Sequence, residues 1–139
     1  MKRLKVAALI VGVAAIALTI AACKKGAGSS PTATFKAFYE ASKKKDIAAA
    51  KQMFSKRTLE LFEIQAKAQN KSVDEILKAG VEQKPVPYKI PELRNEKIDG
   101  DEATLEIRDD QNDKWDTLPF VKEDGQWKIA LDKLGTQRP

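Results

Sequence analysis

Cys23 is the only cysteine in the 139-residue chain and offers its one thiol for chemistry. It follows an uncharged apolar stretch, residues 6–20, which is preceded by the basic residues Lys2, Arg3 and Lys5. A basic start, an apolar stretch and small residues before a break are typical of a secretory signal. The stretch is shorter than the roughly 20 residues of a spanning helix, which disfavours the alternative of a free or buried cysteine ending an uncleaved anchor.

The residues that end this segment, Ile20-Ala21-Ala22-Cys23, resemble the lipobox of bacterial lipoproteins. The resemblance implies that the Cys23 sulfur receives a diacylglyceryl group and that cleavage removes residues 1–22. It also implies acylation of the new amino group, for instance with palmitate. Lys24 and Lys25 follow, where lipoproteins kept in the inner membrane of diderm bacteria tend to carry aspartate. The resemblance therefore implies an envelope lipoprotein in the outer membrane, with its domain facing the periplasm.

Histidine is absent from the sequence, and the one thiol is predicted to carry lipid. Cys/His zinc sites, Ser-His-Asp triads, Cys-His pairs and histidine-bound haem are therefore excluded, as is an intramolecular disulfide. Removal of the signal leaves 117 residues, enough for one domain, and takes away three basic residues, which lowers the formal net charge from +5 to +2. Charges of both signs are interspersed, which argues against nucleic-acid binding.

An acid-rich segment, residues 109–113, is a candidate for calcium binding. An EF-hand loop needs glycine at its sixth position and glutamate at its twelfth. Counted from Asp109, these positions hold Lys114 and Phe120. The composition predicts a turn instead, and neither a metal site nor a cofactor is predicted for this chain.

Helical signals occupy the first half of the predicted domain. Ser30 as N-cap and Pro31 at the first helical position predict a helix start. The spacing i, i+3, i+4, i+7 then places four residues on one helical face. These residues are Phe35, Phe38, Tyr39 and Ser42. Asp46 can cap a second, short helix.

Two further helices are predicted before the pattern changes. One runs over about residues 56–70. Ser72 and Glu75 fit a capping box for the next, and Gly80 predicts its end. A proline-rich break at residues 84–88 then prevents further helix.

After the break, apolar residues alternate with a period of two, as in half-buried strands. Four antiparallel strands are predicted, over roughly 89–98, 102–109, 114–122 and 126–132. Asp99-Gly100 and Asp124-Gly125 predict two-residue hairpins of type I′. Pro119 within the third strand predicts an edge, bend or bulge there.

These patterns predict an α+β fold, with N-terminal helices packed on a curved four-stranded antiparallel sheet. The predicted organisation is a signal peptide (1–22), a lipidated tether (23–30), the α+β domain (31–133) and a tail (134–139). The tether is rich in Gly and Ser, which predicts a flexible chain spanning about 15 Å.

Two segments at the ends of the domain, residues 35–50 and 120–129, resemble the nuclear-transport-factor-2-like superfamily. The first reads Phe35-Lys36-Ala37-Phe38-Tyr39, followed by Lys45-Asp46-Ile47-Ala48-Ala49-Ala50. The second reads Phe120-Val121-Lys122-Glu123-Asp124-Gly125-Gln126-Trp127-Lys128-Ile129. Within the superfamily, the chain is most similar to the lumazine-binding-like (cystatin-like) domain of unknown function of bacterial lipoproteins.

The resemblance implies a cone-like domain with a pocket at its open end. Phe35, Phe38, Tyr39 and Trp115 are the candidate pocket-lining residues, and Tyr39 is alternatively a core residue whose hydroxyl reaches the rim. Ketosteroid-isomerase-like enzymes of the superfamily line this pocket with Asp, Tyr or His. The sequence offers no histidine and no inward acid to pair with a tyrosine, so no catalytic residue is predicted.

The sequence thus predicts a lipoprotein with a non-catalytic binding or scaffolding domain. Its predicted partners are the membrane, through Cys23, and an envelope protein or a small apolar ligand. Two alternatives stay open: a small-molecule carrier or pocket enzyme of the ketosteroid-isomerase-like type, and a folded spacer. An open cavity of several hundred Å³ with convergent polar groups favours the carrier or enzyme.

Overall fold

The computed structural model describes residues 26–135. The predicted signal peptide, the predicted lipid site Cys23 and residues 136–139 of the tail lie outside the described residues. Within residues 26–135, four α-helices precede four β-strands and a short 3-10 helix, so the domain is α+β, as predicted. The elements are α1 (Pro31–Lys43), α2 (Ile47–Lys51), α3 (Lys56–Ala68), α4 (Val73–Gln83), β1 (Leu93–Asp99), β2 (Glu102–Asp109), β3 (Lys114–Glu123), β4 (Gln126–Ile129) and η1 (Leu131–Lys133).

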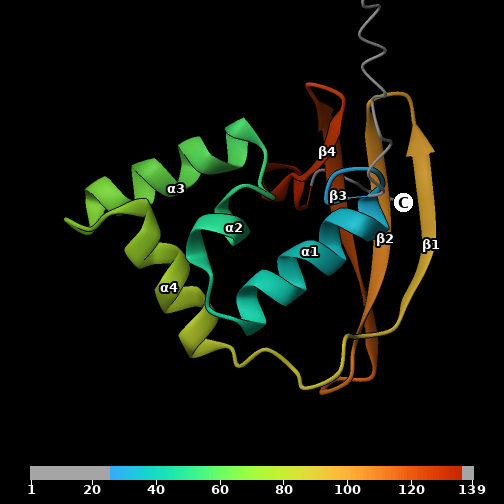
Figure 1. The fold of residues 1–139 in the computed structure, drawn as a ribbon, viewed down its shortest axis with the longest axis horizontal. Coiled ribbons are helices and arrows are strands. Elements are labelled where there is room, and N and C mark those ends of the chain that lie inside the picture. The colour runs from blue at the N-terminus through green and yellow to red at the C-terminus, as the bar shows by residue number, and fades with distance from the viewer. Residues whose placement is uncertain (1–25, 136–139) are drawn as a thin grey trace, which may run out of the picture.

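The strands form one antiparallel sheet in the order β1-β2-β3-β4, and the helices lie on one side of it (Figure 1). Helix α1 packs directly on the sheet, whereas α3 and α4 lie further out and pack on each other. Residues 84–92, which we call the strap, lead from the end of α4 back to β1. The strap therefore joins the outer helices to one end of the sheet.

All four helices begin at a side chain that accepts a hydrogen bond from a backbone N–H three residues on; the caps are Ser30, Asp46, Ser55 and Ser72. The predicted capping box of Ser72 and Glu75 is confirmed. The Ser72 backbone N–H donates to Glu75 and holds the pKa of that carboxyl below its usual range. This hydrogen bond stabilises the folded chain at pH values above the ordinary pKa of a glutamate carboxyl. The stabilisation is lost as the pH falls through the lowered pKa of Glu75.

Helix α4 does not end at Gly80, so that prediction is wrong. The helix continues to Gln83, and Lys84 is extended, with φ −116° and ψ 92°. Lys84 precedes Pro85, and the residue before a proline is disfavoured in helical geometry. The proline, and not the glycine, therefore sets the helix end. Helix α3 ends at Ala68, two residues earlier than predicted.

The predicted strand boundaries are corrected at two places. Strand β1 begins at Leu93 and not at 89, because residues 89–92 belong to the strap. Strand β4 ends at Ile129 and is followed by the 3-10 helix η1, not by more strand. Pro119 accepts from the Ala130 N–H but has no N–H to return, so the β3–β4 pairing stops there.

The two predicted hairpins differ in turn type. Asp124 and Gly125 both have positive φ, 51° and 76°, as a type I′ turn requires. In the first hairpin Asp99 pairs with Glu102, so the two central residues are Gly100 and Asp101. Of these only Gly100 has positive φ, which is the sign pattern of type II′. The type I′ prediction is therefore wrong for the first hairpin.

The core lies between α1 and the sheet, and α4 adds Leu77 to it. Its buried members are Phe35, Phe54, Leu77, Ala103, Leu105, Phe120, Trp127 and Ile129. The buried Thr34 hydroxyl donates to the Trp127 carbonyl at 2.9 Å and ties α1 to β4. Residues 26–135 thus contain a core of their own, which is what an independently folding domain requires.

The end of the predicted tether lies against the sheet. The Gly28 carbonyl accepts from the Trp127 N–H at 2.9 Å. Gly28 has φ 90°, and a Cβ there would lie 3.0 Å from the Gln126 Cβ, so this close approach requires glycine. The prediction of a flexible tether is therefore wrong for residues 26–30. Gly26 is three residues beyond Cys23, a separation of at most roughly 11 Å.

Candidate ligand-binding pocket

A half-open pocket of about 1030 Å³ lies between the helices, the strap and the ends of β2 and β3. Ligand pockets in proteins commonly measure about 300–1,000 Å³, so this one has room for a drug-sized molecule. The alternation of apolar residues on β2 and β4 predicts that Leu105, Ile107, Trp127 and Ile129 fill the interior. Ile107 is only partly buried and lines the pocket, whereas Leu105, Trp127 and Ile129 are buried in the core. They do not close the pocket, because it lies beside this part of the core and shares only some of its residues.

Helix α1 lines the pocket with the face that its sequence predicts. Phe35, Phe38, Tyr39 and Ser42 all belong to the lining. Phe54 and Phe62 continue this wall: the ring centroids of Phe38 and Phe54 are 5.2 Å apart, and those of Phe54 and Phe62 are 5.3 Å apart. Both pairs are edge-to-face, the favoured arrangement of aromatic rings. The inner wall is therefore aromatic and apolar.

Tyr39 holds the strap in place. Its hydroxyl donates to the Pro87 carbonyl at 2.6 Å. The Lys43 ammonium donates to the Tyr88 carbonyl at 3.4 Å and lies 5.2 Å from the centre of the Tyr88 ring. The Tyr39 hydroxyl, which an Asp/Tyr enzyme would need for its substrate, is thus bonded to the backbone of the pocket wall.

Trp115 is the one predicted lining residue that the structure puts elsewhere. It lies on β3 opposite Arg108 of β2. The Arg94 guanidinium stacks 3.7 Å from the centre of its ring, and that of Arg108 lies 6.0 Å away. Such cation–π contacts occupy the indole face. Trp115 therefore supports the sheet and not the pocket.

The charged side chains of the lining are all at least partly exposed. They comprise three cations and three carboxylates: Lys71, Lys84, Arg108, Asp109, Asp110 and Asp116. Residues 110–113 form a turn, as predicted, and Asp109 is the last residue of β2. Asn112 donates its side-chain amide to Asp109 and, with the Gln111 N–H, holds the pKa of that carboxyl below its usual range. Across residues 26–135, acidic, His and Cys side chains form no cluster that could hold a metal ion.

Ser42 is the lining residue whose role the sequence did not reveal. It is only 4 % exposed, and its hydroxyl has no hydrogen-bond partner among the described residues. A serine in a helix usually donates to a carbonyl of the preceding turn or faces solvent, and Ser42 does neither. The signal available in the sequence was a polar residue at position i+7 of an otherwise aromatic helix face.

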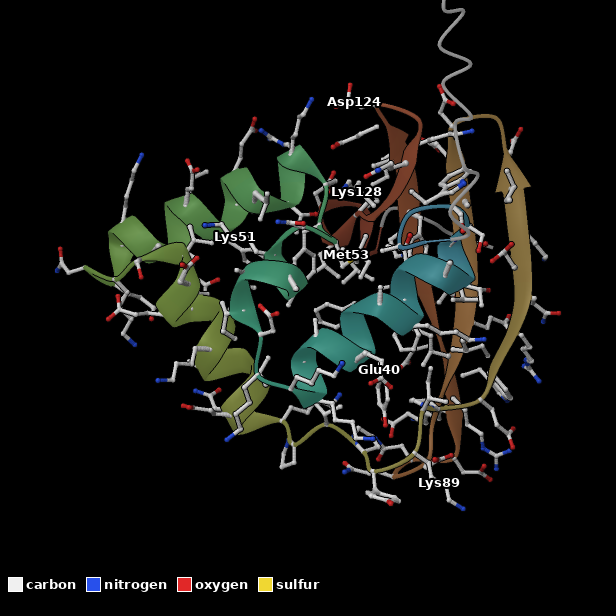
Figure 2. All side chains as sticks on the ribbon, in the orientation of Figure 1. Glu40, Lys51, Met53, Lys89, Asp124 and Lys128 are labelled. Carbon is white, nitrogen blue, oxygen red and sulfur yellow. The ribbon has the colours of Figure 1, made fainter. Side chains whose placement is uncertain are left out.

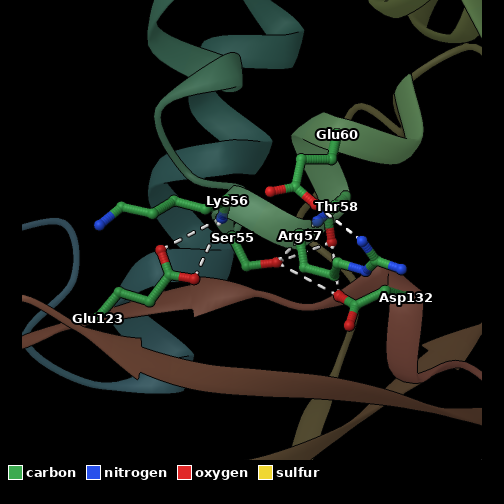
Figure 3. A network of polar contacts seen from close by, with 7 residues as sticks. All are labelled: Ser55, Lys56, Arg57, Thr58, Glu60, Glu123 and Asp132. Carbon is green, nitrogen blue, oxygen red and sulfur yellow. Dashed lines mark hydrogen bonds and ion pairs between the residues drawn. The ribbon is translucent and has the colours of Figure 1, made fainter. Parts of the chain in front are cut away.

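A second polar cluster joins α3 to the C-terminal end of the sheet (Figure 3). The hydroxyls of Ser55 and Thr58 both lie within hydrogen-bonding distance of an Asp132 carboxylate oxygen, at 3.3 Å and 3.0 Å. The Thr58 hydroxyl also accepts from the Leu131 N–H at 2.9 Å. Ser55 and Thr58 do not belong to the pocket lining, and their buried hydroxyls are already hydrogen-bonded to Asp132 and to each other. The cluster caps α3 and fixes η1.

Thr58→Val is expected to lower the free energy of unfolding by about 1–3 kcal/mol. The change keeps the side-chain volume but leaves the Leu131 N–H without its acceptor and removes one of the two hydroxyl donors to the Asp132 carboxylate. Urea unfolding measures the loss. Thr58→Ser keeps the hydroxyl and is expected to lose less than Thr58→Val. A loss in Thr58→Ser that equals or exceeds the loss in Thr58→Val would contradict the prediction, because the methyl group would then matter at least as much as the hydroxyl.

Comparison of the chain with family models, curated proteins and solved structures found no match. Among residues 26–135, the helices are too short or too polar for any of them to cross a bilayer. Function must therefore be argued from the pocket and from the sequence motif at Cys23.

Proposed function

We propose that this chain is an envelope lipoprotein whose domain binds a small apolar molecule. The single observation that carries the proposal is the half-open pocket of about 1030 Å³ with its aromatic inner wall. Pockets of this size, mostly apolar and with few polar groups, are the usual sites of small-molecule binding. The cone-like, nuclear-transport-factor-2-like architecture proposed from the sequence is compatible with such a pocket between helices and sheet.

The proposed role is binding without chemical change. General acid–base catalysis needs a titratable group within hydrogen-bonding reach of the reacting atom. Tyr39 already donates to Pro87, and the carboxylates of the lining lie at its exposed margin. The proposal of a carrier thus agrees better with the lining than that of an enzyme.

The proposed anchor is the acylated Cys23, in the outer membrane and on the periplasmic side. Gly28 fixes the chain beside Gln126 and Trp127, at the Glu102 end of β2. The pocket is lined by Asp109 at the opposite end of β2, and eight strand residues span roughly 23 Å. Figure 2 shows Asp124 and Lys89 at these two ends. The pocket then opens away from the bilayer and receives its ligand from the periplasm.

A protein partner is the second candidate, and one observation favours it. Leu61 and Ile64 lie one turn apart on α3 and are 40 % and 63 % exposed. Residues at i and i+3 share a helix face, so the two form a small apolar surface. Binding through this surface is compatible with ligand binding in the pocket.

Titration with the neutral fluorescent probe N-phenylnaphthylamine tests the proposed function. The titration uses a form of the protein that begins at Lys24, so that it lacks the signal and Cys23 but contains the whole described core. Saturable binding of one probe per chain, with a blue-shifted and enhanced emission, is expected. A linear signal without saturation, in a chain that still melts cooperatively, would contradict the proposal.

A further inference from the structure

Two buried side-chain polar atoms in residues 26–135 lack a hydrogen-bond partner, and both belong to residues that line the pocket. They are the Ser42 hydroxyl oxygen and Arg108 Nε. Arg108 Nε has an ion-pair contact with Asp110 at 3.5 Å, without hydrogen-bond geometry. Buried polar groups in proteins are nearly always hydrogen-bonded, and an exception needs an explanation.

Both residues belong to elements that contact the strap. Ser42 precedes Lys43, which donates to the Tyr88 carbonyl. The Arg108 backbone N–H donates to the Glu92 carbonyl. Ser42 shares the face of α1 that carries Phe35, Phe38 and Tyr39. Arg108 is paired in register with Trp115 and alternates with the buried Leu105 of β2. Ser42 is therefore the unpartnered group that the pocket offers to a ligand. A ligand would meet the aromatic rings of this helix face and the Ser42 hydroxyl beside them.

The charges of the lining indicate that this ligand is uncharged. Its three cations and three carboxylates balance. The Arg108 guanidinium is already paired with Glu92, Asp110 and Asp113. An ion brought beside the buried Ser42 would lose its hydration without gaining an opposite charge, which is costly. A neutral oxygen acceptor, by contrast, would accept from the serine hydroxyl.

We propose that the pocket selects an uncharged, mainly apolar molecule with an acceptor oxygen, such as an ester, ketone or ether, and that Ser42 donates to this oxygen. The proposal rests on the proposed function and adds the chemical class of the ligand. Ser42 sets the specificity for an acceptor group, and the aromatic wall supplies affinity for the apolar part.

Displacement of N-phenylnaphthylamine by three matched compounds tests the ligand class. Methyl naphthoate is a neutral ester, ethylnaphthalene lacks the acceptor, and naphthoate carries a negative charge. The ester is expected to bind about fivefold more tightly than ethylnaphthalene, the ratio that corresponds to one hydrogen bond of about 1 kcal/mol. Naphthoate is expected to bind most weakly. Tightest binding by naphthoate, or no preference among the three, overturns the ligand class while leaving the pocket itself in place.

Ser42→Ala assigns the preference to the serine. The variant is expected to lose the about fivefold advantage of the ester and to bind ethylnaphthalene as the wild type does. Its melting temperature is expected to stay or to rise, because a buried unpaired hydroxyl is removed. Ser29→Ala, at an exposed serine outside the lining, is the matched control. Equal weakening of both compounds in Ser42→Ala would overturn the role of Ser42, and failure of every compound and of the probe to bind would overturn the pocket function as well.

Discussion

Cys23→Ser is expected to abolish lipidation and signal cleavage completely. Only a thiol can accept the diacylglyceryl group that the lipobox resemblance implies, and cleavage follows that transfer. The wild-type protein should begin at Cys23 and carry the added mass of its acyl chains. The variant should keep residues 1–22 and carry no lipid. Intact-mass spectrometry of the membrane fraction distinguishes the two products.

The acyl chains are also expected to hold the wild-type domain firmly on the membrane. One chain gives only marginal, reversible binding, whereas two or more give stable anchoring. Ser29→Ala, six residues beyond the lipidated position, should be processed and lipidated as the wild type is. The lipoprotein proposal would be refuted if Cys23→Ser were processed to the same form as the wild type, or if the wild-type protein carried no lipid.

Fluorophores at the two ends of the domain are expected to differ strongly in their distance from the bilayer. The lipidated protein has no free thiol in this proposal, so Asp124→Cys and Lys89→Cys each create a single labelling site. Gly26 lies within roughly 11 Å of Cys23, and the sheet holds Asp124 near that end. A nitroxide quencher on lipid headgroups should quench the label at position 124 strongly and the label at position 89 hardly at all.

Iodide in solution is the control for this comparison, because both labelled positions are exposed and should be quenched alike. Headgroup quenching that is equal at the two positions would contradict the proposed orientation, and stronger quenching at position 89 would show that the pocket end faces the membrane. The ligand would then come from the bilayer and not from the periplasm.

Local signals in the sequence predicted much of the fold. Ser30, Asp46 and Ser72 were recognised as caps because a cap depends on residues three positions away. The hairpin at Asp124-Gly125 was recognised because both positions must tolerate positive φ. The end of α4 was mispredicted because a glycine in a helix is only mildly unfavourable, whereas the residue before a proline is excluded more strongly.

The pocket depends on contacts that the sequence does not display. The aromatic face of α1 was predictable from its period, but the bond from Tyr39 to Pro87 joins residues 48 positions apart. The position of Trp115 in the alternating pattern of its strand does not distinguish it from a pocket or core residue. In the folded chain, Arg94 of β1 and Arg108 of β2 lie over its ring. The unpartnered state of Ser42 follows from the packing around it, which only the folded chain specifies.

The central claim is that the pocket binds a small apolar molecule. The most direct test is a probe titration of a variant whose pocket is filled by a large side chain. Ala79→Trp places a large side chain at a lining position of α4, and Ala68→Trp makes the same change at an exposed position of α3 outside the lining. The wild type and Ala68→Trp are expected to bind N-phenylnaphthylamine with the same affinity. Ala79→Trp is expected to bind it at least about tenfold more weakly, because steric occlusion removes more than about 1.4 kcal/mol of binding free energy. All three proteins should melt cooperatively. Equal affinity in the three proteins would contradict the claim.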